Sequence, residues 1–294
     1  MTLRQEMQQA ARKSRRTLDA GAAASAGDFL RSQMDPCGAW RNRRGKSDLY
    51  YTVFGIEASS ALGLTLPWDA IERYLLGFGV GAGLDLVHLT CLARAWAACP
   101  KRAGEDLALG IAARLELNRC TDGGYNHLGP QEGGSAYGCF LALGAYEDLA
   151  LAPPGVDGVA ACLGGLRCRD GSFANDRRMP LGLATATAAA AMVLARLGQP
   201  APAKLASWLL SCHHAEGGFS ALPAGPIPDL LSTATSLHAL AAMKVPLDEI
   251  ALTCREFVRG LQSPAGGFAA SMADPAVDCE YTFYGLLALG HLVL

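Results

Sequence analysis

Four aspartates occupy corresponding places in the chain, each directly before a long apolar segment. They are Asp48, Asp85, Asp229 and Asp278. Aspartate is a favoured first residue of a helix, because its carboxylate accepts hydrogen bonds from the backbone amides of the first turn. The pattern therefore predicts four helix caps. A second interpretation is an arc of acidic side chains, since two close carboxylates can make a general acid or bind a hard cation.

Further side chains that can carry protons lie beside these aspartates. Glu280 and His88 fall in the same first turns, and Tyr51 and Tyr281 share the register Asp-x-x-Tyr-Thr at 48–52 and 278–282. A tyrosine in this place lines a cavity or donates a proton. The candidate catalytic residues are Asp48, Asp229, Asp278, Glu280 and Tyr281.

Aromatic and basic side chains are the candidates for ligand binding. The basic residues fall in two loops, Arg41–Lys46 and Arg177–Arg178. Solvated loops are the simplest interpretation, and an anion site for a diphosphate or a docking surface is the alternative. The candidate ligand-binding residues are Tyr51, Phe54, His88, Tyr137, Phe140, Tyr284, Arg177 and Arg178.

A repeat of about 47 residues must position these side chains. A glycine followed by an aromatic residue recurs in Gly38-Ala39-Trp40, Gly123-Gly124-Tyr125, Gly171-Ser172-Phe173, Gly217-Gly218-Phe219 and Gly266-Gly267-Phe268. Each signal follows an amphipathic helical pattern and precedes an almost uncharged one, which is typical of an outer helix paired with a buried inner helix.

Six such pairs are predicted. The outer helices are expected near 22–34, 67–78, 104–118, 155–167, 202–214 and 247–262, and the inner helices near 48–63, 84–98, 134–149, 181–198, 229–243 and 278–293. An open array needs polar capping repeats, whereas the last helix here is apolar throughout. We therefore expect an all-α protein with an α/α toroid fold, a single domain over 1–294, inner helices around a central cavity, and a basic helical segment at about 1–20.

Composition excludes several classes of protein. The chain has 51% hydrophobic and 18% charged residues, which excludes disorder, and its net charge of −2 gives no pull on nucleic acid. The apolar segment 181–198 fits a buried helix better than a transmembrane span. No secretory signal is seen in the first residues, and the ten scattered cysteines are expected to be reduced, so we expect a cytoplasmic protein.

The repeat resembles that of the prenyltransferase and squalene-cyclase superfamily. The likeness is carried by residues 217–240 and by Asp278-Cys279-Glu280-Tyr281-Thr282-Phe283-Tyr284-Gly285. It is closest to the β subunits of protein prenyltransferases, such as the Rab geranylgeranyltransferase β chain. This resemblance implies an isoprenoid or another apolar small molecule in the cavity and a possible helical partner subunit.

The resemblance also implies a zinc site and a diphosphate site, and this chain departs from both. The family's zinc ligands, Asp, Cys and His, fall here on Asp229, Leu231 and Tyr281. A displaced set of Asp229, Cys279 and Glu280 is the alternative, but we expect no metal and no other cofactor. The family's basic diphosphate ligands are absent at the matching positions, and the cyclase motif DxDD has its nearest counterpart in residues 278–281.

Two functions remain open on this basis. The first is a prenyltransferase-like or terpenoid-cyclase-like enzyme, which transfers or cyclises an isoprenoid without the family zinc site. The alternative is a non-enzymatic subunit that binds a lipid or a partner protein with a degenerate catalytic site.

Overall fold

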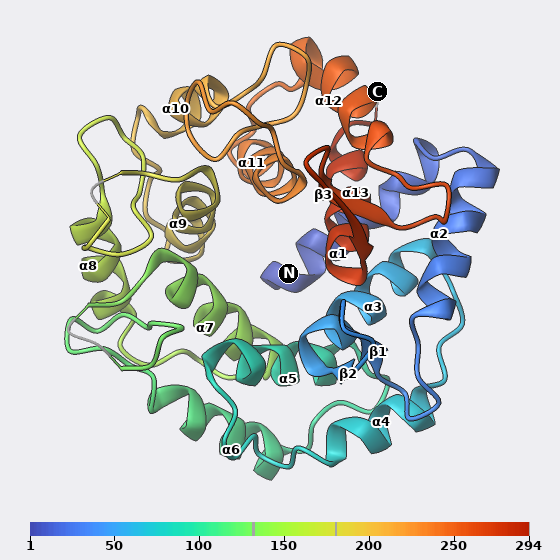
Figure 1. Cartoon of the computed structure of the whole chain (residues 1–294). Helices are drawn as coiled ribbons and strands as arrows, with labels where there is room; N and C mark the ends of the chain where they lie inside the picture. Colours follow the sequence, from blue (N-terminus) through green and yellow to red (C-terminus); the bar gives the residue numbers. More distant parts are fainter. Residues whose placement is uncertain (131–132, 180, 294) are drawn as a thin grey trace. The chain divides into compact units, whose positions relative to one another are not determined.

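The computed structural model describes residues 1–130, 133–179 and 181–293. Within them the chain forms helices α1 to α13, one 3-10 helix and four short strands (Figure 1). The chain divides into two compact units. The first unit holds Met1 and residues 5–74 and 211–294, and the second holds residues 2–4 and 75–210. The single domain expected over 1–294 stays a prediction.

In the first unit a row of three buried helices forms the core. Helix α13 (Cys279–His291) packs between α11 (Leu230–Ala242) and α3 (Leu49–Leu62). Helices α2 (Ala20–Ser32) and α12 (Asp248–Gly260) pack on the outside of α3 and α13. The three central helices have few exposed residues, and the outer helices are amphipathic. This confirms the predicted alternation of outer and inner helices.

The second unit repeats this arrangement. Helices α5 (Leu86–Ala98), α7 (Ala136–Asp148) and α9 (Ala184–Arg196) pack in series. Helices α6 (Glu105–Glu116) and α8 (Val156–Leu166) lie against α5 and α7. Two outer helices, α4 (Trp68–Leu76) and α10 (Leu205–Ser211), cross the boundaries between the units. Segment 181–198 thus contains the largely buried helix α9, and no helix of the described residues is long and apolar enough to cross a membrane.

The aromatic residue of each Gly-aromatic loop is fully buried, and in four loops its backbone amide bonds to a threonine of the following helix. Phe219 N donates to Thr233 Oγ1 at 2.9 Å, and Phe268 N donates to Thr282 Oγ1 at 3.2 Å. The same bond joins Trp40 to Thr52 and Phe173 to Thr187. Each loop is thereby fixed to the first turn of an inner helix.

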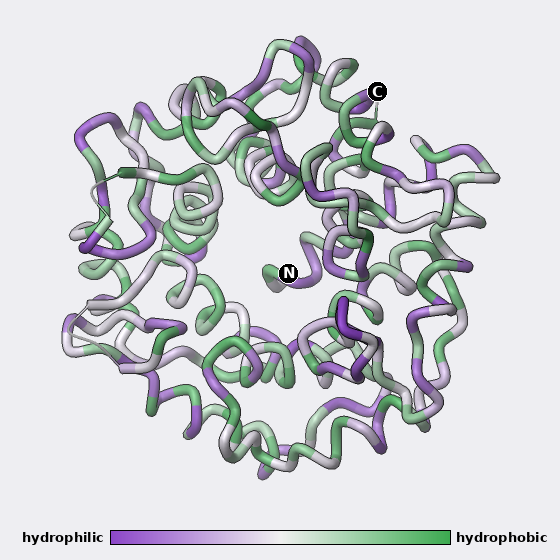
Figure 2. The backbone as a smooth tube through the Cα atoms, in the orientation of Figure 1, coloured by the Kyte–Doolittle hydropathy of each residue, from purple (hydrophilic) through white to green (hydrophobic). Residues whose placement is uncertain are grey.

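Two loops contain short antiparallel hairpins that the sequence pattern does not predict. Strands β1 (Trp40–Arg41) and β2 (Ser47–Asp48) lead into α3, and β3 (Phe268–Ser271) and β4 (Asp274–Asp278) lead into α13. The β1–β2 turn is strongly hydrophilic, as Figure 2 shows in purple. Both hairpins end at the aspartate that caps the next helix.

The N-terminal segment has one buried face. Helix α1 (Leu3–Lys13) and the 3-10 helix η1 (Ser14–Arg16) follow one another. In the first unit, Gln8 donates to the Glu57 carbonyl of α3 and Thr17 donates to the Leu289 carbonyl of α13. In the second unit, the Leu3 amide donates to Glu147 at 2.6 Å. The basic residues from Arg12 to Arg16 are exposed, as the sequence predicts.

The Gly-aromatic loops require glycine for a steric reason that can be tested. Gly266 has φ of +101°, and a Cβ there would overlap the Ser25 carbonyl oxygen of α2. We expect Gly266→Ala to lower the free energy of unfolding by about 3 kcal/mol or more, because backbone strain and overlap add. Gly45 has φ of +75° but nothing within 4 Å of its added Cβ, so Gly45→Ala should cost only the strain, about 1–2 kcal/mol.

Denaturant titrations of both variants measure the difference. Equal losses for Gly266→Ala and Gly45→Ala would contradict the close packing of this loop against α2.

Candidate functional site

Glu280 lies in the first turn of α13 and is held by a tyrosine of the neighbouring helix α3. The Tyr50 hydroxyl donates to Glu280 Oε1 at 2.6 Å. Both residues are only partly exposed. They occupy the same place in their repeats, two residues after the capping Asp48 and Asp278. The packing of α3 against α13 therefore brings an acid and a phenol together.

The surroundings of Glu280 raise its pKa into the neutral range. Burial, together with the smaller effect of the nearby Asp278 carboxylate, raises the pKa of Glu280 from its ordinary value of 4.5 to about 7. The Tyr50 hydrogen bond and the Arg43 charge act in the opposite direction, because both favour the ionised form. A carboxyl group with this pKa can donate a proton under physiological conditions.

Asp278 and Arg43 form an ion pair beside this acid. Arg43 Nε lies 2.7 Å from Asp278 Oδ2, and its Nη1 lies 2.8 Å from Asp274 Oδ2. Burial nevertheless raises the pKa of Asp278, against the opposing effect of its hydrogen bonds and of Arg43. Arg43 also lies 5.5 Å from the centre of the Tyr281 ring. The ion pair joins the β1–β2 turn to strand β4 and so connects two loops distant in sequence.

An aromatic cluster from α3 and α13 continues from Tyr50. The Tyr50 and Phe54 rings are 5.0 Å apart in an edge-to-face arrangement, and Tyr284 lies 5.5 Å from Phe54. Tyr51 and Phe283 complete the cluster. The tyrosines are partly exposed, whereas the two phenylalanines are buried. Such a cluster offers an apolar wall with ring faces that can attract a cation.

The four aspartates cap helices, as the first interpretation predicts. Asp48, Asp229 and Asp278 accept bonds from the first-turn amides of α3, α11 and α13, and Asp85 does so for α5. Burial raises the pKa of Asp229. Burial raises the pKa of the Tyr51 hydroxyl to about 12, and the carboxylates of Asp278 and Asp48, in the same unit, act in the same direction.

The remaining predicted residues belong to the second unit. His88 contacts its own cap, with Nδ1 2.8 Å from Asp85 Oδ1. Tyr137 and Phe140 lie partly exposed on α7, and the Tyr137 ring is 5.5 Å from that of His127. Their role in ligand binding, like that of the first-unit residues, stays a prediction.

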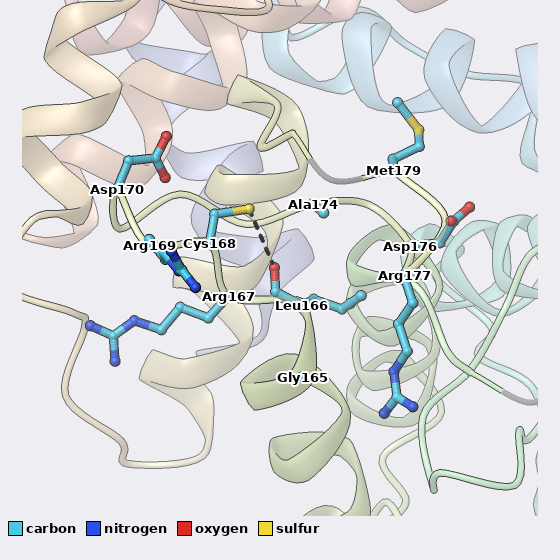
Figure 3. A pocket seen from close by; sticks show the side chains of 10 residues that line it. All are labelled: Gly165, Leu166, Arg167, Cys168, Arg169, Asp170, Ala174, Asp176, Arg177 and Met179. Carbon is cyan, nitrogen blue, oxygen red and sulfur yellow. Dashed lines mark hydrogen bonds between the residues drawn. The ribbon is translucent and has the colours of Figure 1, made fainter.

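The predicted basic pair, Arg177 and Arg178, is engaged with carboxylates. Arg177 lies 3.3 Å from Asp122, and Arg178 lies 3.4 Å from Asp176. Arg177 lines a surface pocket of about 630 Å³. Figure 3 shows Arg177 and Arg167 on opposite sides of it. Because Asp170 and Asp176 also line the pocket, its charge is mixed.

The residues at the family's zinc position do not fit a zinc ion. Leu231 offers no ligand atom, and Asp229 Oδ1 already accepts the Ser232 amide at 2.7 Å. Cys279, from the displaced set, is fully buried, and this burial strongly raises the pKa of its thiol and disfavours the thiolate that zinc requires. The described residues contain no group of three metal-ligating side chains.

Tyr50 is absent from the sequence-based candidates, and Arg43 appears there only within the basic loop 41–46, without its carboxylate partners. The signal for Tyr50 was present, since Tyr50 and Glu280 share one position in the repeat. The ion pairs of Arg43 could not be found in this way, because its partners lie 231 and 235 residues away along the chain.

The Glu280 environment predicts a specific pH dependence of stability. Between pH 4.5 and 7 the folded chain keeps a proton that the unfolded chain releases, so raising the pH favours unfolding. Relative to Glu280→Gln, which cannot titrate, the wild type should lose about 2–3 kcal/mol of unfolding free energy from pH 4.5 to pH 8. Urea titrations at several pH values measure this, with the exposed Glu256→Gln as control. A difference that stays constant with pH would refute the raised pKa.

Comparisons with known proteins identify the fold of this chain. Residues 172–292 match the family model of the prenyltransferase alpha-alpha toroid domain. A search of curated proteins gives no match. Among solved structures, two variants of the type II terpene cyclase MstE from Scytonema are similar over 99% of this chain and 98% of theirs. One, in complex with geranylgeranyl dihydroxybenzoate, has a TM-score of 0.63 and 14% identity, and the other, with merosterolic acid A, has 0.61 and 15%.

A protein from Actinoplanes is similar over 93% of this chain and 98% of its own, with a TM-score of 0.59 and 17% identity. At such identities these likenesses show the fold alone. They confirm the predicted fold class: the chain is a mainly helical α/α toroid, similar to the prenyltransferase toroid domain and to type II terpene cyclases.

Proposed function

We propose that this protein binds an isoprenoid and starts its cyclisation by protonating a carbon–carbon double bond, with Glu280 as the general acid. The observation that carries the proposal is the carboxyl group itself. Its pKa is raised to about 7 by burial, and Tyr50 holds it from the adjacent helix at 2.6 Å. Glu280 therefore combines a bound proton with a fixed orientation.

Glu280 and Tyr50 account for the first proton transfer, and solvent water completes the cycle. Because Glu280 Oε1 accepts the Tyr50 hydroxyl, the transferable proton belongs on Oε2. It moves to the less substituted carbon of a trisubstituted double bond, leaving a tertiary carbocation and a carboxylate. A second double bond attacks the cation to close a ring, and a water molecule then takes a proton from the adjacent carbon to leave a double bond. Solvent returns a proton to the Glu280 carboxylate. The Tyr50 hydrogen bond strengthens as the carboxylate forms, which favours the transfer.

The aromatic cluster suits the intermediate that this step creates. A carbocation cannot be stabilised by water without being captured, whereas aromatic faces attract it without forming a bond. Tyr50, Tyr51 and Tyr284 are partly exposed next to the acid. The isoprenoid chain itself gains about 0.8 kcal/mol for each buried CH₂.

The substrate class we propose is an isoprenoid without a diphosphate. The Scytonema cyclase is described with geranylgeranyl dihydroxybenzoate as substrate and merosterolic acid A as product, and neither name contains a diphosphate. This supports the proposal, since Gly134 and Ala221–Pro226 supply no basic side chain where the family binds diphosphate.

Other functions receive less support from the geometry. Prenyl transfer to a thiol, as in the Rab geranylgeranyltransferase β chain, would need the zinc site that Leu231 and Tyr281 do not provide. A non-enzymatic subunit that binds a lipid or a helical partner is favoured by one observation. Asp48, Asp229 and Asp278 are all engaged as helix caps, so Glu280 alone carries the enzymatic proposal.

Incubation in D₂O tests the reaction directly. Geranylgeranyl dihydroxybenzoate, geranylgeraniol and squalene serve as probes, with mass spectrometry of the products. We expect a cyclised product that carries one carbon-bound deuterium from the acid. Glu280→Gln should lower the rate about 10²- to 10⁴-fold, the usual contribution of a general acid, while Glu256→Gln leaves it unchanged.

Binding of the same probes, measured by calorimetry, separates the alternatives. Glu280→Gln should bind them about as tightly as the wild type. Binding without turnover of any probe by the wild type would favour the non-enzymatic subunit. Full activity in Glu280→Gln would show that another group is the acid.

A further inference from the structure

Three arginines surround a small cavity at the opposite end of α13 from Glu280. The cavity has a volume of about 280 Å³ and is lined by Arg16, Thr17, Arg255, Arg259 and Val293. Arg16 ends η1, Arg255 and Arg259 lie one turn apart on α12, and Val293 follows α13. All of these residues belong to the first unit. With 13 residues in α13, this cavity is about 20 Å from its first turn.

No carboxylate lines this cavity, and none neutralises its arginines within the described residues. Arg255 Nη2 donates to the Leu292 carbonyl at 2.6 Å, and Arg259 donates to the Thr17 carbonyl. These bonds orient the two guanidinium groups without removing their charge. Over residues 1–130, 133–179 and 181–293, neither they nor Arg16 form an ion pair.

A buried donor adds a second, independent observation. Arg255 Nε is enclosed by the protein and has no hydrogen-bond partner within the same residues. A buried N–H of a cation without a partner is costly, and three neighbouring cations repel one another. An anion in the cavity would offset the repulsion among the three cations and would lie close to the buried Arg255 group.

We propose that this cavity binds a phosphate group, as inorganic phosphate or diphosphate. Three guanidinium groups can each donate two parallel hydrogen bonds, and a phosphate offers four oxygens where a carboxylate offers two. The volume lies just below the usual range of sites for larger ligands, which fits a small anion. The second-unit pocket of Figure 3 is a weaker candidate, because Asp170 and Asp176 line it as well.

This phosphate site is independent of the proposed cyclisation. It lies at the other end of α13 from the acid and uses none of the residues assigned to that reaction. The two proposals can therefore fail separately.

Calorimetric titration at constant ionic strength tests the site. Inorganic phosphate, diphosphate and acetate serve as probes, and we expect one phosphate or diphosphate per chain, bound at least about 10-fold more tightly than acetate. Arg16→Gln should weaken phosphate binding about 10-fold. Arg16 is the preferred position because Arg255 and Arg259 also support the chain through their carbonyl bonds.

Arg15→Gln is the matched control, since Arg15 is adjacent and exposed but does not line the cavity. It should change phosphate affinity less than about 2-fold. Equal weakening by Arg15→Gln would show a diffuse surface effect and overturn the site. No binding of either phosphate probe would mean that the chain itself already neutralises the arginines, which also overturns it.

Discussion

The bond between a loop amide and a helical threonine is the contact on which the repeat depends. In four of the Gly-aromatic loops the aromatic residue's amide donates to a threonine of the next inner helix, namely Thr52, Thr187, Thr233 or Thr282. In three of these helices the same hydroxyl donates to the carbonyl of the capping aspartate. One buried side chain thus satisfies a loop donor and a helix-end acceptor, which would otherwise cost stability. The aromatic ring then completes the core.

This constraint explains how the site can differ between repeats without loss of the fold. The cap, the threonine and the aromatic residue make this contact, whereas the residue two positions after the cap takes no part in it and differs from repeat to repeat. That position holds Tyr50 in one helix and Glu280 in another. Because both helices start in the same way and pack side by side, these two side chains meet. Burial then sets the chemistry of Glu280, by raising its pKa to about 7.

Much of the architecture could be read from the sequence because the repeat is periodic. The predicted inner helix at 229–243 is observed at Leu230–Ala242, and that at 278–293 at Cys279–His291. Their caps are the predicted Asp229 and Asp278. Hydrophobic period and capping chemistry are local properties, and they are written in consecutive residues.

The long-range part of the site could not be predicted in the same way. The hairpin pairing of Phe268 with Asp278 depends on the loop returning across the helix start. The Arg43 bridge to Asp274 and Asp278 joins the first and last repeats. Such contacts depend on which helices become neighbours, and the periodicity of the sequence does not specify which helices those are.

The proposed chemistry depends on a Glu280 carboxyl group that titrates near neutral pH. Carbon-13 NMR of side-chain carboxyl groups measures this directly, with the Glu280 signal assigned by its absence in Glu280→Gln. The account predicts a titration midpoint near pH 7, in keeping with the pKa of about 7 that burial gives this group. A midpoint near the ordinary value of 4.5 would contradict it, because the ionised carboxylate would then have no proton to donate at neutral pH.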